Sequence, residues 1–220
     1  MLNTRLQTIL EILPEIHSVV DVGTDHCLLP IAIKQKFPNM EVAAADVAKG
    51  PLASAQKQLL DHNIHDIQLY LSNGVHTIDK QYDCVIIAGM GANTMMDIIG
   101  QDLDYCHNCK YLILQANKDV DLLRKWLNEH EFSIVDERMV FDYKYYQILV
   151  VTNGQQILSE EDIVFGPVLR KQHDEVYVEY WKQELDKCKG IAQQLPENHP
   201  KLQLANEMID FIEKNIWDFK

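Results

Sequence analysis

The chain of 220 residues lacks any apolar run near the roughly 18 residues that a membrane-spanning helix needs. Its start lacks the charged flank and cleavage pattern of a secretory signal peptide; residues 1–14 instead have the spacing of a short amphipathic helix. No internal repeat or low-complexity segment is visible. We therefore expect a cytoplasmic protein that neither crosses nor binds a membrane.

Cysteine is scarce, and its five copies are an odd number scattered along the chain. Such usage is typical of a reduced protein rather than a disulfide-stabilised one. Cys106, His107 and Cys109 resemble half of a zinc site. No second cysteine pair follows, so we expect no bound metal.

Basic residues are also in deficit, with 20 lysines and arginines against 33 acidic residues and a net charge of −13. Residues 1–155 and residues 156–220 are each acidic on balance. Taken alone, this charge argues against a nucleic-acid partner. Any RNA must therefore be held by a local basic patch.

Apolar residues make up 47% of the chain, which is enough for a sizeable core. Residues 18–30 have the pattern of a strand, a tight turn at Gly23 and a helix. Further strands are expected at 41–46, 67–71, 83–88 and 111–114, and helices at about 51–60, 93–99 and 120–130. The carboxyl ends of parallel strands share one edge, where open α/β sheets bind ligands.

Polar residues and glycines follow each of these strands. Asp46 lies 23 residues past Gly23, close to the spacing at which an acidic residue binds a ribose diol. No G-x-G-x-x-G motif is present, and Asp21 and Asp25 would repel a pyrophosphate. The edge therefore suits a cationic or hydroxyl-rich ligand.

The pattern changes after the fifth strand. Residues 132–141 and 145–152 read as strands separated by a gap too short for a helical crossover, so they must be antiparallel. A terminal hairpin of this kind is typical of methyltransferases that use S-adenosylmethionine. We predict an α/β fold with a Rossmann-like class I methyltransferase sheet in residues 1–155.

Two long helices are expected in residues 156–220, at about 168–195 and 200–217, with apolar residues at spacings of three and four. The pattern predicts a C-terminal helical domain that forms an antiparallel coiled coil. The alternative is that the two helices simply cover the sheet.

At this point the chain resembles the bacterial tRNA (adenine-22-N1)-methyltransferase family, which is also called TrmK-like. The matching motifs are D-V-G-T-D-H at 21–26, Leu29-Pro30, Gly50-Pro51, Asn73-Gly74, I-A-G-M-G at 87–91, L-I-L-Q at 112–115 and Gly166-Pro167. The resemblance implies a catalytic domain with a C-terminal coiled coil, S-adenosylmethionine as cofactor and tRNA as substrate. The sequence departs from the family at Leu28, Ala92 and Ala116, where Tyr, Gly and Pro are frequent.

The resemblance also implies which residues line the site. The expected cofactor-binding residues are Asp21, Gly23, Thr24, Asp46, Val47, Asn73, Gly74, Gly89, Met90 and Gly91. The expected substrate contacts are Arg5 to phosphate, with a plain surface charge as the alternative, and Gln115 and Asn117 to the base edge, with capping of the following helix as the alternative.

Asp25 and His26 are the candidate catalytic residues. Adenine N1 attacks through an in-plane lone pair, so the reaction needs alignment more than deprotonation. Because the product base gains positive charge, the Asp25 carboxylate would stabilise the transition state. His26 would orient the base or accept a proton from the exocyclic amine; otherwise it is a capping or packing residue.

Three rival functions remain open from the sequence. The acidic surface would favour a methyltransferase that acts on a small molecule. Asp46 alone would permit a nucleotide-linked oxidoreductase, which the hairpin and the missing glycine motif argue against. Leu28 in place of Tyr leaves a cofactor-binding, RNA-associated adaptor without catalysis conceivable.

Overall fold

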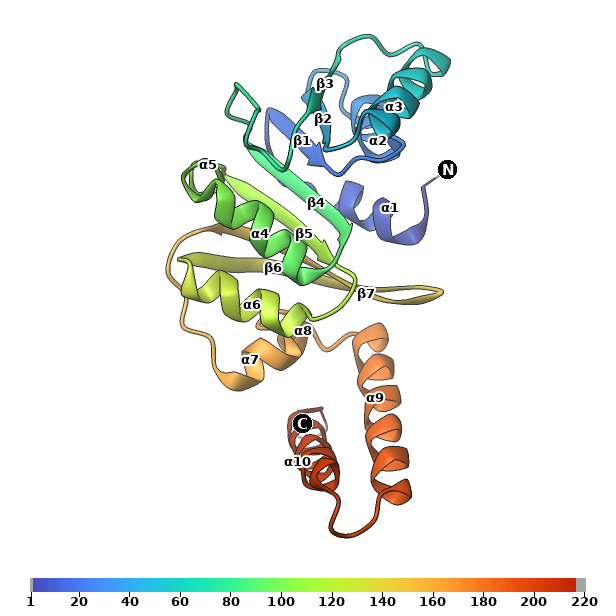
Figure 1. Cartoon of the computed structure of the whole chain (residues 1–220), viewed down its shortest axis with the longest axis vertical. Helices are drawn as coiled ribbons and strands as arrows, with labels where there is room; N and C mark the ends of the chain where they lie inside the picture. The colour runs from blue at the N-terminus through green and yellow to red at the C-terminus, as the bar shows by residue number, and fades with distance from the viewer. Residues whose placement is uncertain (1, 217–220) are drawn as a thin grey trace.

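The computed structural model describes residues 2–216, which contain a seven-stranded sheet of order β3-β2-β1-β4-β5-β7-β6 (Figure 1). The strands are β1 (Ser18–Val22), β2 (Glu41–Asp46), β3 (Ile67–Leu71), β4 (Cys84–Met90), β5 (Tyr111–Ala116), β6 (Phe132–Asp142) and β7 (Lys144–Asn153). β1 to β5 pair in parallel, whereas β7 is antiparallel to both β5 and β6. The predicted parallel sheet with one terminal hairpin is confirmed.

Helices cover both faces of the sheet. These helices are α1 (Thr4–Glu11), α2 (Leu28–Lys36), α3 (Lys49–Asp61), α4 (Ala92–Gln101), α5 (Leu103–His107) and α6 (Val120–Glu129). Alternate strand residues point to opposite faces, so Val19 packs in the core beneath α1, α2 and α3, while Val20 packs beneath α4 and α6. β4 is buried from Cys84 to Ile87, as expected for a central strand.

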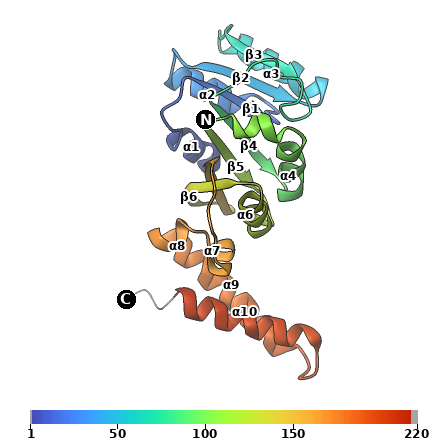
Figure 2. The ribbon, with the colours of Figure 1, turned by 90° about the vertical axis from the view of Figure 1, so that its left-hand side faces the viewer.

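The C-terminal region holds four helices, α7 (Glu160–Phe165), α8 (Leu169–Gln172), α9 (Glu175–Gln194) and α10 (Pro200–Ile216). α9 and α10 lie side by side and extend from the β6 edge of the sheet, where α9 contacts β6 (Figure 2). They have a separate core around Phe165, Trp181 and Ile212, which also includes Met139 of β6. Both predicted long helices are present, and their supercoiling remains a prediction.

The first of these helices is shorter than predicted. His173 adopts a left-handed conformation with φ of 51°, and the Asp174 side chain then accepts a hydrogen bond from the Tyr177 backbone N–H. A new helix therefore begins at Glu175, without any glycine or proline to mark the break. Short α5 and α7 were also not predicted.

A buried ion pair joins the C-terminal helices to the sheet. Arg124 of α6 donates to Glu137 of β6 at 2.8 Å, with both side chains almost fully buried. Arg124 also donates to the carbonyl oxygens of Ile163 and Val164 at the end of α7. Glu137 accepts from the backbone N–H groups of Val168 and Leu169. The pair thus satisfies the backbone on both sides of the turn between α7 and α8.

Within residues 2–216, no helix has the length and apolarity to span a membrane.

Candidate functional site

The carboxyl ends of the parallel strands meet at one edge and bring most of the predicted residues together. Two cavities open there. The first, of about 320 Å³, is lined by residues that include Arg5, Asp21, Thr24, Asp25, His26 and Gly89. The second, of about 280 Å³, is lined by residues that include Asp46, Val47, Asn73, Gly74, Met90 and Asp97.

Gly23 and Met90 form the partition between the two cavities. Gly23 has φ of +76°, and a Cβ added there would lie 2.0 Å from the Met90 Cε. The methyl group of Met90 therefore lies against the Gly23 backbone, in space that any other residue would fill. Because methionine is unbranched and flexible, this side chain is the movable part of the partition.

Opposite charges face each other in the first cavity. Asp21 is 6% exposed, and burial raises its pKa from 3.8 to about 6, against the lowering effects of the Thr24 hydroxyl and of Arg5. The Arg5 guanidinium lies 5.4 Å from the centre of the Tyr146 ring. At neutral pH, this cavity therefore presents a carboxylate and a guanidinium to any ligand.

Gln115 holds Arg5 and the end of β4 in place. Its Oε1 accepts a short hydrogen bond from Arg5 and a second, at 3.1 Å, from the Gly89 backbone N–H. Gln115 is fully buried, so the structure gives it a supporting position and not the exposed one expected of a base-reading residue. Asn117 is exposed and donates to the Gly89 carbonyl oxygen at 2.6 Å.

Gly89 lies at an irregularity in the pairing of β4 with β5. Its φ is +82°, and a Cβ there would approach Arg5 Nη1 to 3.1 Å. Glycine is therefore needed both for the backbone conformation and for the close approach of the guanidinium.

Backbone groups hold the Asp46 carboxylate at the second cavity. Oδ1 accepts from the Ala48 N–H at 2.9 Å, and Oδ2 lies 3.5 Å from the Asp25 N–H. The second cavity also has a wall that sequence reasoning missed, from Thr94, Asp97 and Gln101 of α4. Their spacing of three and four places them on one helix face, a signal that the sequence did contain.

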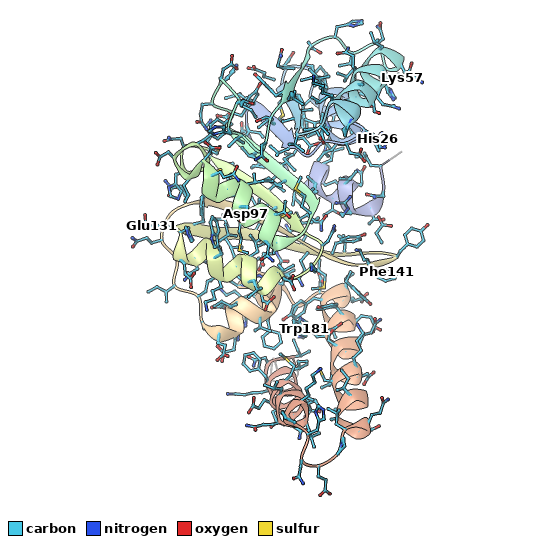
Figure 3. The ribbon with its side chains drawn as sticks, viewed as in Figure 1. His26, Lys57, Asp97, Glu131, Phe141 and Trp181 are labelled. Carbon is cyan, nitrogen blue, oxygen red and sulfur yellow. The ribbon has the colours of Figure 1, made fainter. Side chains whose placement is uncertain are left out.

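Asp25 and His26 lie at the rim of the first cavity. Asp25 Oδ2 is 3.5 Å from His26 Nε2, and their side chains are 70% and 58% exposed. Asp25 and Cys27 both have positive φ, of 51° and 58°, so the loop turns sharply before α2. His26 is labelled in Figure 3. Both polar side chains are accessible to a substrate that enters this cavity.

Leu28 lines the same cavity and is 43% exposed. Gly91, by contrast, lines neither cavity and serves as the N-cap of α4. A third cavity, of about 360 Å³, lies between Asn117 and the C-terminal helices and is lined in part by Arg124, Tyr145 and Trp181.

No group of three metal-ligating side chains occurs in the part of the chain that the structure describes. Cys106 and Cys109 are buried and free, and burial raises the pKa of the Cys109 thiol to about 12. Both thiols therefore stay protonated at neutral pH.

Comparison with known proteins identifies one family and several similar structures. The family model described as tRNA (adenine(22)-N(1))-methyltransferase matches residues 19–216. A Bacillus subtilis (strain 168) protein of that name is 29% identical over 205 residues, which are 89% of this chain and 86% of the relative. A Streptococcus pneumoniae protein solved with S-adenosyl-L-methionine has 32% identity and a TM-score of 0.89, over 98% of this chain and 100% of that chain. M. capricolum TrmK in complex with S-adenosyl-homocysteine has 27% identity and a TM-score of 0.86, over 98% of each chain.

Proposed function

Because this chain belongs to the tRNA (adenine(22)-N(1))-methyltransferase family, we propose that its strand-end edge binds S-adenosylmethionine and presents the methyl group to N1 of adenine 22 in tRNA. The predicted family, fold class and cofactor are confirmed. The chain is an S-adenosylmethionine-dependent tRNA methyltransferase. The observation that carries the residue assignments is the pair of cavities that meet at Gly23 and Met90.

The two cavities match the two ends of the cofactor. Asp46 faces the second cavity and would accept hydrogen bonds from the ribose hydroxyls, while Val47, Asn73 and Gly74 would lie against the adenine. The methionine end is a zwitterion. Asp21 would bind its ammonium group, and Arg5 would bind its carboxylate, in the first cavity.

This arrangement changes the role expected for Arg5. Its guanidinium lies at the cavity wall, beside Gly89 and the ring of Tyr146. A tRNA phosphate would approach from the outer surface, whereas a carboxylate inside the cavity would meet the guanidinium directly. We therefore favour the cofactor over phosphate as the partner of Arg5.

The bound cofactor supplies a methyl group on a positively charged sulfonium. The residues of the chain align the acceptor and exclude water. The Asp25 carboxylate, at the rim, stabilises positive charge as it develops on the adenine ring. His26 lies beside Asp25, where it orients the base or accepts a proton from the exocyclic amine. The adenine must leave its stack to enter the cavity.

We also propose a division of labour between two domains. Residues 1–155 carry the edge of the sheet that would bind the cofactor, and residues 156–220 would supply an elongated surface for RNA. The separate core around Phe165, Trp181 and Ile212 supports this division within the described residues. The five free cysteines support a location in the reducing cytoplasm.

The test of function is incubation of the protein with S-adenosylmethionine and bulk tRNA, followed by mapping of methylated nucleosides. We expect 1-methyladenosine at position 22 and no methylation of small molecules. An Asp25→Asn variant is the control, because it should keep the cofactor affinity and lose most of the turnover. Methylation at another position or of another substrate class would contradict the proposal.

A further inference from the structure

The hairpin of β6 and β7 projects beyond the cofactor edge of the sheet (Figure 1). Leu149 of β7 pairs with Leu114 of β5, and β5 ends only two residues later, at Ala116. The pairs Val140–Tyr146, Phe141–Tyr145 and Asp142–Lys144 therefore extend past the end of β5. At about 3.3 Å a residue, the hairpin tip reaches roughly 10 Å beyond the sheet.

The direction of the strands places this tip on the catalytic side. β6 is antiparallel to β7, and β7 is antiparallel to β5, so β6 runs in the same direction as β5. The carboxyl end of β6 thus lies at the edge where β1, β2 and β4 also end. Tyr146, at the base of the projection, contacts Arg5, which lines the first cavity.

Tyr143 occupies the tip of the hairpin in a strained backbone conformation. Its φ is +61°, a left-handed conformation that asparagine or glycine adopts with less strain. Its side chain is 98% exposed, so burial does not compensate for the strain. Phe141, labelled in Figure 3, is 55% exposed on the same hairpin. Strained, exposed groups of this kind are characteristic of functional sites.

The surroundings of the tip favour a nucleic acid. Lys144 lies 5.0 Å above the ring of Tyr146, and Arg5 approaches the same ring. Lys118, 74% exposed, lies at the end of β5 on this edge. In a chain of net charge −13, Lys144 and Lys118 add positive charge to the edge at which the rings of Phe141 and Tyr143 are exposed, a combination suited to phosphates and bases.

We propose that Tyr143 stacks on an unpaired base of the tRNA substrate, and that Lys144 binds the adjoining phosphate. The proposal rests on the proposed function, since the polymer that delivers its adenine to the first cavity must pass this hairpin. Aromatic stacking is tolerant of base identity, so the contact would position the RNA without reading its sequence.

The experiment compares Tyr143→Gly with Tyr143→Phe in the full chain. Glycine relieves the left-handed strain and removes the ring, whereas phenylalanine keeps the ring. Ile157→Gly is the matched control, because Ile157 is also 98% exposed but follows β7, whose carboxyl end lies at the opposite edge. For each variant, the tRNA dissociation constant, the KM for tRNA, the cofactor affinity and the melting temperature are measured.

We expect Tyr143→Gly to weaken tRNA binding and raise the KM about 5- to 100-fold, with cofactor affinity unchanged and a melting temperature equal or higher. Tyr143→Phe and Ile157→Gly should match the wild type in tRNA binding. Unchanged tRNA binding by Tyr143→Gly, or no recovery with phenylalanine, would overturn the proposal. A Tyr143-dependent dimer in sedimentation, with unchanged tRNA binding, would do the same and assign the tip to a second copy.

Failure of the proposed function is distinguishable from these outcomes. If the wild type binds tRNA but methylates no adenine, the activity assignment falls, and the binding comparison still decides the role of Tyr143. If the wild type methylates adenine 22 and Tyr143→Gly does so with the same KM, the activity stands and the stacking role is refuted.

Discussion

Asp21 couples the stability of the protein to its affinity for the cofactor, and Asp21→Asn should separate the two. Burial raises the pKa of this carboxyl from 3.8 to about 6, so the folded state binds the proton more tightly than the unfolded chain. The stabilisation is complete below about pH 4 and is lost as the pH rises through 6. A difference of about two pKa units corresponds to a cost of about 3 kcal/mol at pH 7.

Asparagine has the same shape and no charge to bury. Asp21→Asn should therefore raise the free energy of unfolding by up to about 3 kcal/mol at pH 7, and by little at pH 4. Its cofactor affinity should fall tenfold or more, because a charged hydrogen bond to the ammonium group is lost. Wild-type affinity should decline below pH 6, while that of the variant should stay flat.

Urea unfolding and calorimetric titration with S-adenosylmethionine, each from pH 4 to 8, measure these effects. Asp66→Asn is the matched control, since the hydrogen bond from Lys34 lowers the pKa of that exposed carboxyl and its loss should not stabilise the fold. An Asp21→Asn variant less stable than the wild type at pH 7 would refute the reasoning about burial. Unchanged cofactor affinity would remove Asp21 from the binding site.

Three other substitutions test separate parts of the structure. Asp46→Ala should weaken cofactor binding by roughly 1–3 kcal/mol through lost hydrogen bonds to the ribose, and unchanged calorimetric affinity in a folded variant would exclude that contact. Gly23→Ala should lower stability by about 1–2 kcal/mol, because alanine is strained in the left-handed backbone conformation, and its Cβ should displace Met90. Adding Met90→Ala should restore cofactor binding but not stability. Recovery of both properties would show that the backbone strain is unimportant. Arg124→Ala should cost about 3–5 kcal/mol in urea unfolding, because Glu137 is left buried without a partner. Arg124→Met combined with Glu137→Leu should recover only part of this loss, because the backbone groups of the turn between α7 and α8 then lose their partners, and a single variant as stable as the wild type would contradict the pairing.

Much of the cofactor edge was predictable because it depends on local sequence and one topological rule. Asp21, Asp46 and Asn73 each lie at or just beyond the carboxyl end of a strand, and parallel strands bring such positions to one edge. The hairpin was predictable because the gap between its strands cannot hold a crossover. Both conclusions needed only spacing and direction.

Contacts between segments that are distant in the chain could not be predicted from the sequence. Gln115 also lies near the carboxyl end of a strand, yet it is buried and accepts a hydrogen bond from Arg5, 110 residues away. The contact of Met90 with Gly23 depends on how β1 and β4 pair, which no local pattern specifies. The break at His173 similarly arises from a left-handed residue that carries no glycine signal.

The packing of α1 has a consequence for synthesis of the chain on the ribosome. α1 contacts β6, and its buried Ile9 and Leu10 share a core with Ile148 and Val150 of β7. The first helix must therefore wait until the last strands of the sheet are synthesised, and at 5–20 residues a second this delay is about 7–28 s. Arg5 reaches Tyr146 only after that interval, so the methionine end of the cofactor site is the last part of the nascent domain to become competent.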